Sequence, residues 1–265
     1  MVNRIAIAIG AHPDDIEFYM AGTLLQLKRA RYETHYFNIA SGNCGSNEHN
    51  STRTRALRRK EARRAAAVLG AHFHPSLTDD LEIVYEVSLL RRVAAVLRDV
   101  RPGIVLTHSP QDYMEDHTNT CRLVVTAAFA TPMPNFQTRP RRAAIDGDVA
   151  VYHCMPHGLR DPLRRRVMPG IFVNTGSVHE TKLHALARHQ SQQQWLEVSQ
   201  GLNSYLQTMS DMSIQLGRLS KRFKHAEGWR RHLHLGFSRA DIDPLRHALG
   251  KDYLLNVAYE KRLEQ

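Results

Sequence analysis

Residues 11–15, with the sequence AHPDD, place one histidine and two carboxylates directly after the first apolar run of the chain. That run, residues 5–10, has the length and character of a buried strand, and residues 16–30 have the spacing of a helix. The polar pentapeptide therefore lies in the turn that leaves the first strand. Open α/β sheets bind their ligands at such turns, so this position favours an α/β fold with its functional site there.

The residues of this turn leave two interpretations open. In the first, His12 and Asp15 bind one metal ion, and Asp14 between them is free to act as a base. In the second, Asp14 only caps the following helix, because Asp14 and Glu17 have the spacing of a capping box. Other parts of the chain have to decide between the two.

Strand-like and helix-like segments alternate after this turn. Further strands are expected at residues 35–39, 72–74, 104–107, 148–153 and 171–174, and helices around residues 53–69, 89–97, 123–128 and 181–200. This alternation predicts an α/β, Rossmann-like fold in which helices flank a mainly parallel sheet. Because no linker divides the chain, we expect a single domain over residues 1–265, with its core at about residues 4–200 and a C-terminal helical extension at about residues 201–265.

A second polar cluster follows the expected strand at residues 104–107. Residues 108–117 (HSPQDYMEDH) are rich in groups that ligate metals or transfer protons. Because the carboxyl ends of parallel strands meet at one edge of a sheet, this segment should face residues 11–15. Two such clusters at converging strand ends favour the metal interpretation over the capping one.

The two clusters together contain a complete set of zinc ligands. A catalytic zinc usually has three protein ligands and one water, which the metal acidifies toward neutral pH. His12 and Asp15 supply two ligands from one loop, and His117 is the expected third. Asp14 can reach the water without binding the ion, so it is the expected general base. Another divalent transition metal is compatible with the same residues.

With these residues assembled, the sequence resembles the LmbE-like, or PIG-L, family of zinc-dependent N-acetylglucosamine deacetylases. The resemblance spans about residues 4–200 and rests on residues 11–15, Arg58, Glu61 and Ala62, Leu69 and Gly70, Asp116 and His117, Lys182, and residues 189–192. It implies hydrolysis of an acetamide on a sugar or sugar conjugate. It also implies that the three expected ligands bind zinc and that Asp14 is the base.

One position departs from the family pattern. Many members have a histidine that serves as acid or oxyanion partner where this chain has Met114, and a thioether cannot donate a proton. The candidates for the displaced role are His108, His153, Tyr113 and Asp14 itself. We favour a mechanism in which Asp14 returns the proton and His108 or His153 contacts the oxyanion. Each of these histidines also fits a purely structural role at the end of a strand.

Several polar residues are expected around the ligands. Asp116, without a histidine partner at position 114, is expected to orient His117 from outside the ligand shell. The glycine-bearing loop at residues 41–46 is suited to a close approach of the backbone to a ligand. The expected substrate contacts are Arg58, Asn43 and Tyr113. Arg58 fits equally well a role in bracing the 41–46 loop.

The composition limits the partners of the protein. The net charge of +10 permits an anionic partner, but the arginines of residues 53–64 lie on one face of an amphipathic helix and no nucleic-acid module is found. No apolar run approaches the roughly 20 residues of a membrane span, and the three cysteines lack disulfide or zinc spacing. We therefore expect a cytoplasmic protein that binds neither nucleic acid nor membrane. A homo-oligomer is compatible with the resemblance.

The predicted function is metal-dependent removal of an N-acyl group, in the simplest case acetyl, from a small amino sugar or amino-sugar conjugate. One alternative keeps the amide hydrolysis but changes the substrate to a non-sugar N-acyl metabolite. A second alternative is a sugar-binding protein whose catalysis lapsed when Met114 replaced the histidine. The two enzyme hypotheses require amide turnover, whereas the binding hypothesis excludes it.

Overall fold

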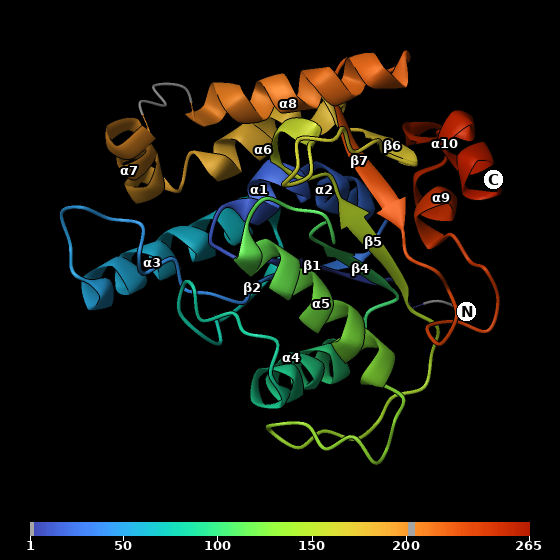
Figure 1. The fold of residues 1–265 in the computed structure, drawn as a ribbon, viewed down its shortest axis with the longest axis horizontal. Helices are drawn as coiled ribbons and strands as arrows, with labels where there is room; N and C mark the ends of the chain where they lie inside the picture. The colour runs from blue at the N-terminus through green and yellow to red at the C-terminus, as the bar shows by residue number, and fades with distance from the viewer. Residues whose placement is uncertain (1–2, 201–204) are drawn as a thin grey trace.

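A central sheet with helices on both faces organises the chain, and the computed structural model describes residues 3–200 and 205–265 of it (Figure 1). Within these residues the sheet has eight strands, in the order β3-β2-β1-β4-β5-β7-β6-β8. They are β1 (Ile5–Gly10), β2 (Glu33–Asn38), β3 (His72–His74), β4 (Ile104–Thr107), β5 (Ala150–Cys154), β6 (Ile171–Asn174), β7 (Ala226–Arg231) and β8 (Tyr253–Leu255). The predicted α/β fold class is confirmed.

The pairing directions divide the sheet into two parts. Strands β3, β2, β1, β4 and β5 run parallel to one another, whereas β7, β6 and β8 are joined by antiparallel pairings. β1 lies between β2 and β4 and reads as a nearly continuous apolar run because both faces of the parallel part are covered. The carboxyl ends of β1 and β4 therefore lie side by side, which brings the turn after Gly10 next to the loop after Thr107.

Helices cover both faces of this sheet. They are α1 (Asp15–Tyr19), α2 (Ala21–Arg29), α3 (Ser51–Leu69), α4 (Val87–Val100), α5 (Glu115–Ala130), α6 (His179–Leu186), α7 (Gln190–Gln200), α8 (Tyr205–Ser220), α9 (Pro244–Leu249) and α10 (Val257–Leu263). Side chains alternate along β1, so Ile7 and Ile9 pack in one core with α4 and α5, while Ala6 and Ala8 pack in a second core with α2, α3 and α8. Figure 1 shows α4 and α5 on the opposite side of the sheet from α2 and α8.

Two segments expected as single helices are interrupted. Residues 16–30 form α1 and α2 with a break at Met20, whose φ of −133° and ψ of −22° are not helical. Residues 181–200 fall into α6 and α7, which are separated by residues 187–189. Both breaks change the direction of the chain beside the strand ends, which a periodicity argument cannot detect.

The C-terminal part is less purely helical than expected. It contains α8, α9 and α10, but it also contributes β7 and β8 to the sheet. β7 pairs with both β5 and β6, and its Trp229 is fully buried. Its sequence, AEGWRR, mixes polar and apolar residues without alternation, so the strand was not predicted. The boundary proposed near residue 200 stays a prediction, although the sheet itself crosses it.

A buried ion pair holds β7 against the helices. The ammonium of Lys182 on α6 lies 2.7 Å from Oε1 of Glu227 on β7, and both residues are almost fully buried. The Glu227 carboxylate also accepts hydrogen bonds from the backbone N–H groups of Gly22 and Thr23, at 2.8 and 2.7 Å, at the start of α2. One carboxylate therefore ties together three elements that are far apart in the sequence.

We expect Lys182→Met to lower the free energy of unfolding by about 3 kcal/mol, because it leaves the Glu227 carboxylate buried without its counter-charge. Urea unfolding followed by far-UV circular dichroism measures the change. Lys60→Met, at an exposed position on α3, is the matched control and should change the stability by less than about 0.5 kcal/mol. Equal stability of the two variants would contradict this role of the pair.

Candidate active site

A cavity of about 470 Å³ opens where β1 and β4 end, at the edge predicted from the strand order. Its walls come from the turn after β1, the loops after β2, β3 and β4, the turn after β5, and helices α1, α3, α5, α7 and α8. The lining residues are His12, Asp14, Asp15, Phe18, Tyr19, Cys44, Gly45, Arg58, Asp80, Leu81, Tyr113, Met114, His117, His157, Gln192, Trp195, Leu196, Tyr205 and Thr208. This size and the mixture of aromatic and polar groups suit a small-molecule ligand.

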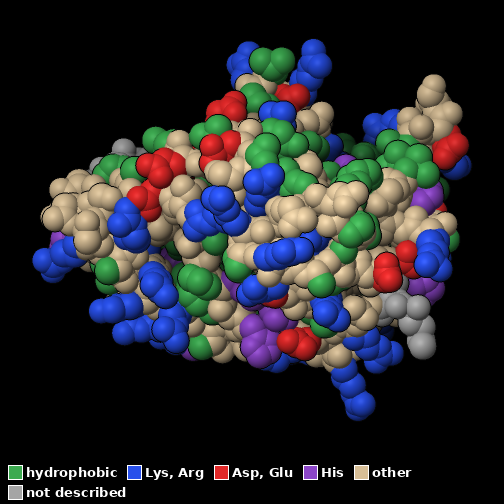
Figure 2. Space-filling model, turned by 90° about the horizontal axis from the view of Figure 1, so that it is seen from below, with side chains coloured by type: hydrophobic (Ala, Val, Ile, Leu, Met, Phe, Trp, Pro, Cys, Tyr) green, Lys and Arg blue, Asp and Glu red, His purple; other side chains and the backbone are tan. Residues whose placement is uncertain are grey.

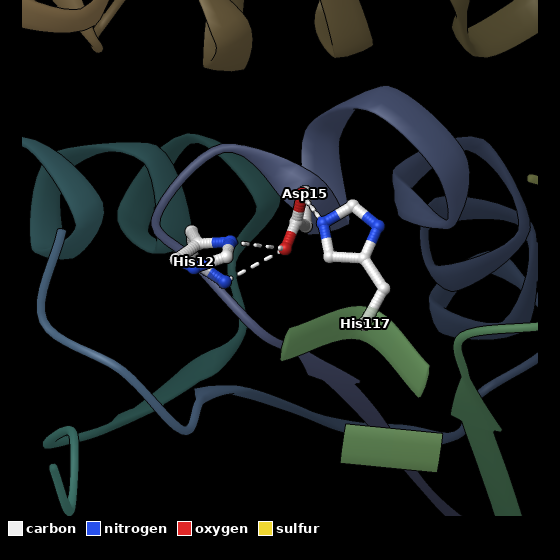
Figure 3. Close-up of side chains that lie close together, drawn as sticks. All are labelled: His12, Asp15 and His117. Atoms are coloured by element: carbon white, nitrogen blue, oxygen red, sulfur yellow. Dashed lines mark hydrogen bonds and ion pairs between the residues drawn. The ribbon is translucent and has the colours of Figure 1, made fainter. Parts of the chain in front are cut away.

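The three residues predicted as metal ligands lie together in this cavity (Figure 3). His12 Nδ1 is 3.6 Å from Asp15 Oδ2, and His117 Nε2 is 3.3 Å from Asp15 Oδ1. One ligand atom from each residue lies within 4.8 Å of the other two. In a tetrahedral zinc site, ligand atoms at about 2.0–2.2 Å from the ion lie about 3.3 Å from one another. The spacing of these side chains therefore fits a zinc-sized ion.

Each of the two histidines is oriented by its own carboxylate. His12 Nε2 is 2.9 Å from Asp116 Oδ2, and His117 Nδ1 is 3.0 Å from Asp112 Oδ1. In each ring one nitrogen is thereby engaged and the other is left toward Asp15, which is the arrangement of metal-binding histidines. Asp116 was expected to orient His117, and this expectation was wrong. Asp116 contacts His12, and Asp112, in the loop five positions before His117, takes the expected place.

The protonation of this cluster also fits a divalent cation. Burial alone would lower the pKa of His12, but hydrogen bonds with Asp116 and Asp15 raise it to about 9. Burial opposes the protonated form of His117 as well, and the Asp15 charge with the Asp112 hydrogen bond raises its pKa to about 10. The carboxylates thus attract two positive charges at neutral pH, and a divalent ion supplies the same charge when it displaces the two protons.

Asp14 is held away from the helix that it precedes. It has φ of 106°, which is rare for a residue with a side chain, and its carboxylate makes no capping hydrogen bond to α1. Its Oδ2 accepts a hydrogen bond of 2.5 Å from the Tyr205 hydroxyl, and its Oδ1 lies 3.4 Å from Nη2 of Arg58. Burial raises the pKa of Asp14 to about 6, against the lowering effect of Arg58. The capping box is therefore not formed, and a buried carboxyl faces the cavity instead.

The two histidines considered for the oxyanion lie behind the cavity wall. The His108 ring stacks on that of His117 at 4.0 Å, and its Nε2 is 3.0 Å from the Ala11 N–H and 3.2 Å from Asp15 Oδ2. His153 donates from Nδ1 to the His108 carbonyl at 2.9 Å, and burial lowers its pKa to about 4. Neither is among the residues that line the cavity. These contacts are those of residues that support the ligands from behind.

Of the three expected substrate contacts, Tyr113 and Arg58 line the cavity and Asn43 does not. Tyr113 lines the cavity with 58% of its side chain exposed. Arg58 also lines the cavity. Its guanidinium donates to the Pro13 carbonyl at 2.5 Å and packs against Gly42, so Arg58 braces the 41–46 loop as well. The amide of Asn43 does not line the cavity, because it bonds to the Ser51 hydroxyl and to the backbone N–H of Asp80.

Several residues of the site were not predicted. Asp112, Asp80, His157 and Tyr205 all contact ligands, loops or the cavity. Asp112 could have been found, since it shares the polar loop with His117. Tyr205 is 191 positions from Asp14, on a helix whose apolar spacing gives no sign of its neighbour. His157 lies on a short turn after β5, at a position where the sequence has no periodic pattern.

The Asp80 side chain forms hydrogen bonds with the backbone of the 41–46 loop. Its carboxylate accepts hydrogen bonds from Gly42 N–H at 2.7 Å and from Cys44 N–H at 3.0 Å. The next residue, Leu81, donates its N–H to Asp116 Oδ2 at 2.8 Å, which is the oxygen that holds His12. The loop was expected to offer its backbone to a ligand, and its N–H groups instead bind this carboxylate. The chain from Asp80 through Leu81 to Asp116 therefore fixes the His12 ring.

The matches to known proteins agree with this geometry. The PIG-L family, described as GlcNAc-PI de-N-acetylase, matches residues 7–128, which include the three ligands and Asp14. Residues 7–128 of the chain thus resemble the PIG-L family. One relative, the diacetylchitobiose deacetylase of Thermococcus kodakarensis, is 29% identical over 231 residues, which are 84% of this chain and 81% of the relative. Deacetylation of sugar-like substrates is thus an activity of the family.

A second relative has a different reaction. The 4-oxalmesaconate hydratase of Pseudomonas putida is 26% identical over 191 residues, which are 69% of this chain and 72% of the relative. The crystal structure of the 4-carboxy-2-hydroxymuconate hydratase from Pseudomonas putida superposes with a TM-score of 0.74 at 22% identity, covering 90% of this chain and 98% of that chain. At this identity the superposition shows a shared fold alone.

One face of the molecule shows how its basic side chains are distributed. On the face shown in Figure 2, lysine and arginine side chains are spread among acidic and uncharged ones. None of the helices in the described part of the chain combines the length and apolar character that crossing a bilayer requires.

We expect Asp80→Ala to weaken zinc binding about tenfold, because Leu81 and Asp116 lose the support that keeps His12 in place. Isothermal titration calorimetry with zinc measures the affinity. Glu82→Gln, on the exposed part of the same loop, is the control and should bind zinc like the wild type. Wild-type affinity in Asp80→Ala, at unchanged thermal stability, would show that His12 does not need this loop.

Proposed function

We propose that this protein is a zinc-dependent hydrolase that removes an N-acyl group, in the simplest case acetyl, from an amino sugar or amino-sugar conjugate. The observation that carries the proposal is the position of the buried Asp14 carboxyl beside three side chains with zinc-ligand spacing in one cavity. The deacetylase among the relatives supports an amide as substrate. The size of the cavity supports a small molecule.

In this proposal His12, Asp15 and His117 hold the ion, which supplies a Lewis acid for the acyl oxygen and lowers the pKa of a nearby water. Asp14 accepts the proton of the attacking water, and the Tyr205 hydroxyl and Arg58 keep its carboxylate directed at the cavity. Arg58 also donates to the Pro13 carbonyl, which fixes the turn that carries the base.

The leaving amine needs a proton, and Asp14 is placed to return the one it took. Met114 lines the cavity but has no proton to give, and His108 and His153 lie behind the wall. A carboxyl group with a pKa of about 6 is well matched to both accepting and releasing a proton near neutral pH. The C–N bond then breaks with this proton on nitrogen, so the step needs no further acid.

A hydratase is the second candidate, because a relative with that activity matches 69% of the chain. Amide hydrolysis and hydration both begin with the attack of a water whose proton passes to a base, so the same residues serve either. The reactions differ in the group attacked, an amide carbonyl or a carbon–carbon double bond. Assaying N-acetylated sugars for free amine, and unsaturated carboxylic acids for loss of ultraviolet absorbance, separates them.

The purified protein should contain about one divalent ion per chain, and a chelator should abolish turnover until zinc is restored. His117→Ala should lose both metal and turnover, because only two ligands remain. His72→Ala, which changes an exposed histidine outside the cavity, is the control and should keep both. Elemental analysis and the amine assay measure the outcome. Full turnover without metal would overturn the zinc proposal.

Asp14→Asn should keep the metal and the fold but lower kcat by about 10²–10⁴-fold, since the amide cannot accept the proton of the water. Steady-state kinetics with parallel metal analysis distinguishes this from loss of the ion. The isosteric change preserves hydrogen bonding to Tyr205, so a misfolded variant is not expected. Turnover close to that of the wild type would remove Asp14 from the role of base.

Met114→His tests whether a proton donor is missing. If Asp14 returns the proton, the added imidazole is redundant, and we expect kcat to rise by less than about tenfold. The same kinetic assay across pH 5–9 measures the change, with Met133→His on the surface as the control. A gain far above tenfold would show that the wild type lacks an acid.

A further inference from the structure

Three histidines lie together on the two outermost strands of the parallel part of the sheet. β3 is the edge strand, and among the described residues it pairs only with β2. The register of this parallel pair sets His35 opposite His72 and Phe37 opposite His74. Side chains two positions apart on a strand point to the same face, so Glu33, His35, His72 and His74 share one face of the edge. These four residues, called the edge cluster here, are separate from the residues that line the active-site cavity.

The polar atoms of the edge cluster face one another. His35 Nδ1 lies 2.8 Å from His74 Nε2, and His35 Nε2 lies 3.1 Å from Oε1 of Glu33. The same Glu33 oxygen is 3.6 Å from His72 Nε2, and the ring centroids of His35 and His72 are 5.0 Å apart. Ligand atoms of a tetrahedral zinc site lie about 3.3 Å from one another, so both contacts of the Glu33 oxygen are close to this spacing. Two imidazoles on neighbouring strands thus flank one carboxylate oxygen.

The protonation of the edge cluster suits metal binding, because its inner histidines stay neutral. Burial lowers the pKa of His35 despite the nearby Glu33 charge, and burial with the neighbouring His35 and His72 lowers that of His74 to about 4. A neutral imidazole keeps a lone pair on one nitrogen, which zinc, copper and nickel ions bind well. When His35 donates its Nδ1–H to His74, this lone pair lies on Nε2, the nitrogen that faces Glu33.

We propose that Glu33, His35 and His72 bind a second divalent transition-metal ion, which cross-links the edge strand β3 to β2. The ligand atoms are Glu33 Oε1 and the Nε2 atoms of the two histidines, and water completes the coordination shell. His74 does not bind the ion but holds the His35 ring through its other nitrogen. The side chains of His72 and Glu33 are 68% and 51% exposed, so they can turn toward the ion without disturbing the core.

The cross-link would stabilise a strand that has little support of its own. β3 has three residues and one neighbouring strand, so few hydrogen bonds hold it in the sheet. The chain passes from β3 into residues 75–81, where Asp80 and Leu81 support the proposed ligand His12. An ion shared by β2 and β3 therefore also fixes the start of this segment.

The edge cluster is more open to solvent than the proposed catalytic ligands, since the side chains of His117 and Asp15 are only 3% and 9% exposed. We therefore expect the edge cluster to fill when zinc is added, whereas the purified protein retains the ion in the cavity. His72→Ala then loses only the added ion and keeps the catalytic one. Neither ion depends on the other.

Calorimetric titration with zinc in a His117→Ala background tests the edge cluster without the proposed catalytic ion. His117→Ala should still bind about one zinc ion per chain. Zinc at about a hundred times its Kd should raise the Tm of this variant by about 5 °C. Adding His72→Ala should weaken the binding at least about tenfold and remove the thermal shift, because the ion loses one of its three ligands. Adding His247→Ala instead, at an exposed position on α9, is the matched control and should change neither.

The outcomes separate the edge site from the proposed function. If His117→Ala binds no zinc, or if the His72→Ala and His247→Ala forms bind it equally well, the edge site is overturned and the hydrolase is unaffected. Equal loss of binding in both double variants would also overturn it, because the effect would not be specific to the edge cluster. Loss in the His72→Ala form alone supports the edge site, whether or not the protein hydrolyses any N-acyl sugar.

Discussion

The carboxylate of Asp15 is the group on which the site depends. Its Oδ2 accepts the backbone N–H of His12 at 2.7 Å and lies 3.2 Å from Nε2 of His108, while its Oδ1 faces His117. Positive groups around it hold the pKa of Asp15 well below its usual value despite burial, chiefly through the charges of His117 and His108. A single side chain thereby joins the end of β1, the end of β4 and the start of α5. Any shift of these elements changes the distances between the proposed ligands.

The sequence allowed the inner part of the site to be predicted because its residues are adjacent to strands. His12, Asp14 and Asp15 follow β1, and His117 follows β4, so the strand order alone brings them to one edge. The same reasoning failed for Tyr205, which reaches Asp14 from α8 through tertiary packing and has no signal in local periodicity. It also failed for β7, because its buried face is defined by the Lys182–Glu227 pair and by Trp229 rather than by alternating apolar residues.

The outer carboxylates show a second limit of reasoning from spacing. Asp116 is next to His117 in sequence, and adjacency suggested that the two interact. On a helix, consecutive residues point about 100° apart, so neighbours in sequence do not face each other. Asp116 is therefore directed toward His12, and the loop residue Asp112 reaches His117. Helix geometry therefore explains why Asp116 does not face His117, whereas the partner of His117 depends on the conformation of the loop before α5.

The place of β7 in the sheet has a consequence for the order in which the protein is made. Among the described residues, β6 is joined to the parallel strands only through β7, which pairs with β5 on one side and with β6 on the other. During synthesis the two parts of the sheet cannot be joined until residue 231 has left the ribosome, although the proposed ligands at residues 12, 15 and 117 are made long before. α8 precedes β7 directly and carries Tyr205, so the proposed base can gain this hydrogen bond only after residue 205 has been synthesised. The proposed metal ligands thus all lie in the first half of the chain, whereas the environment of Asp14 also needs Tyr205 from the second half.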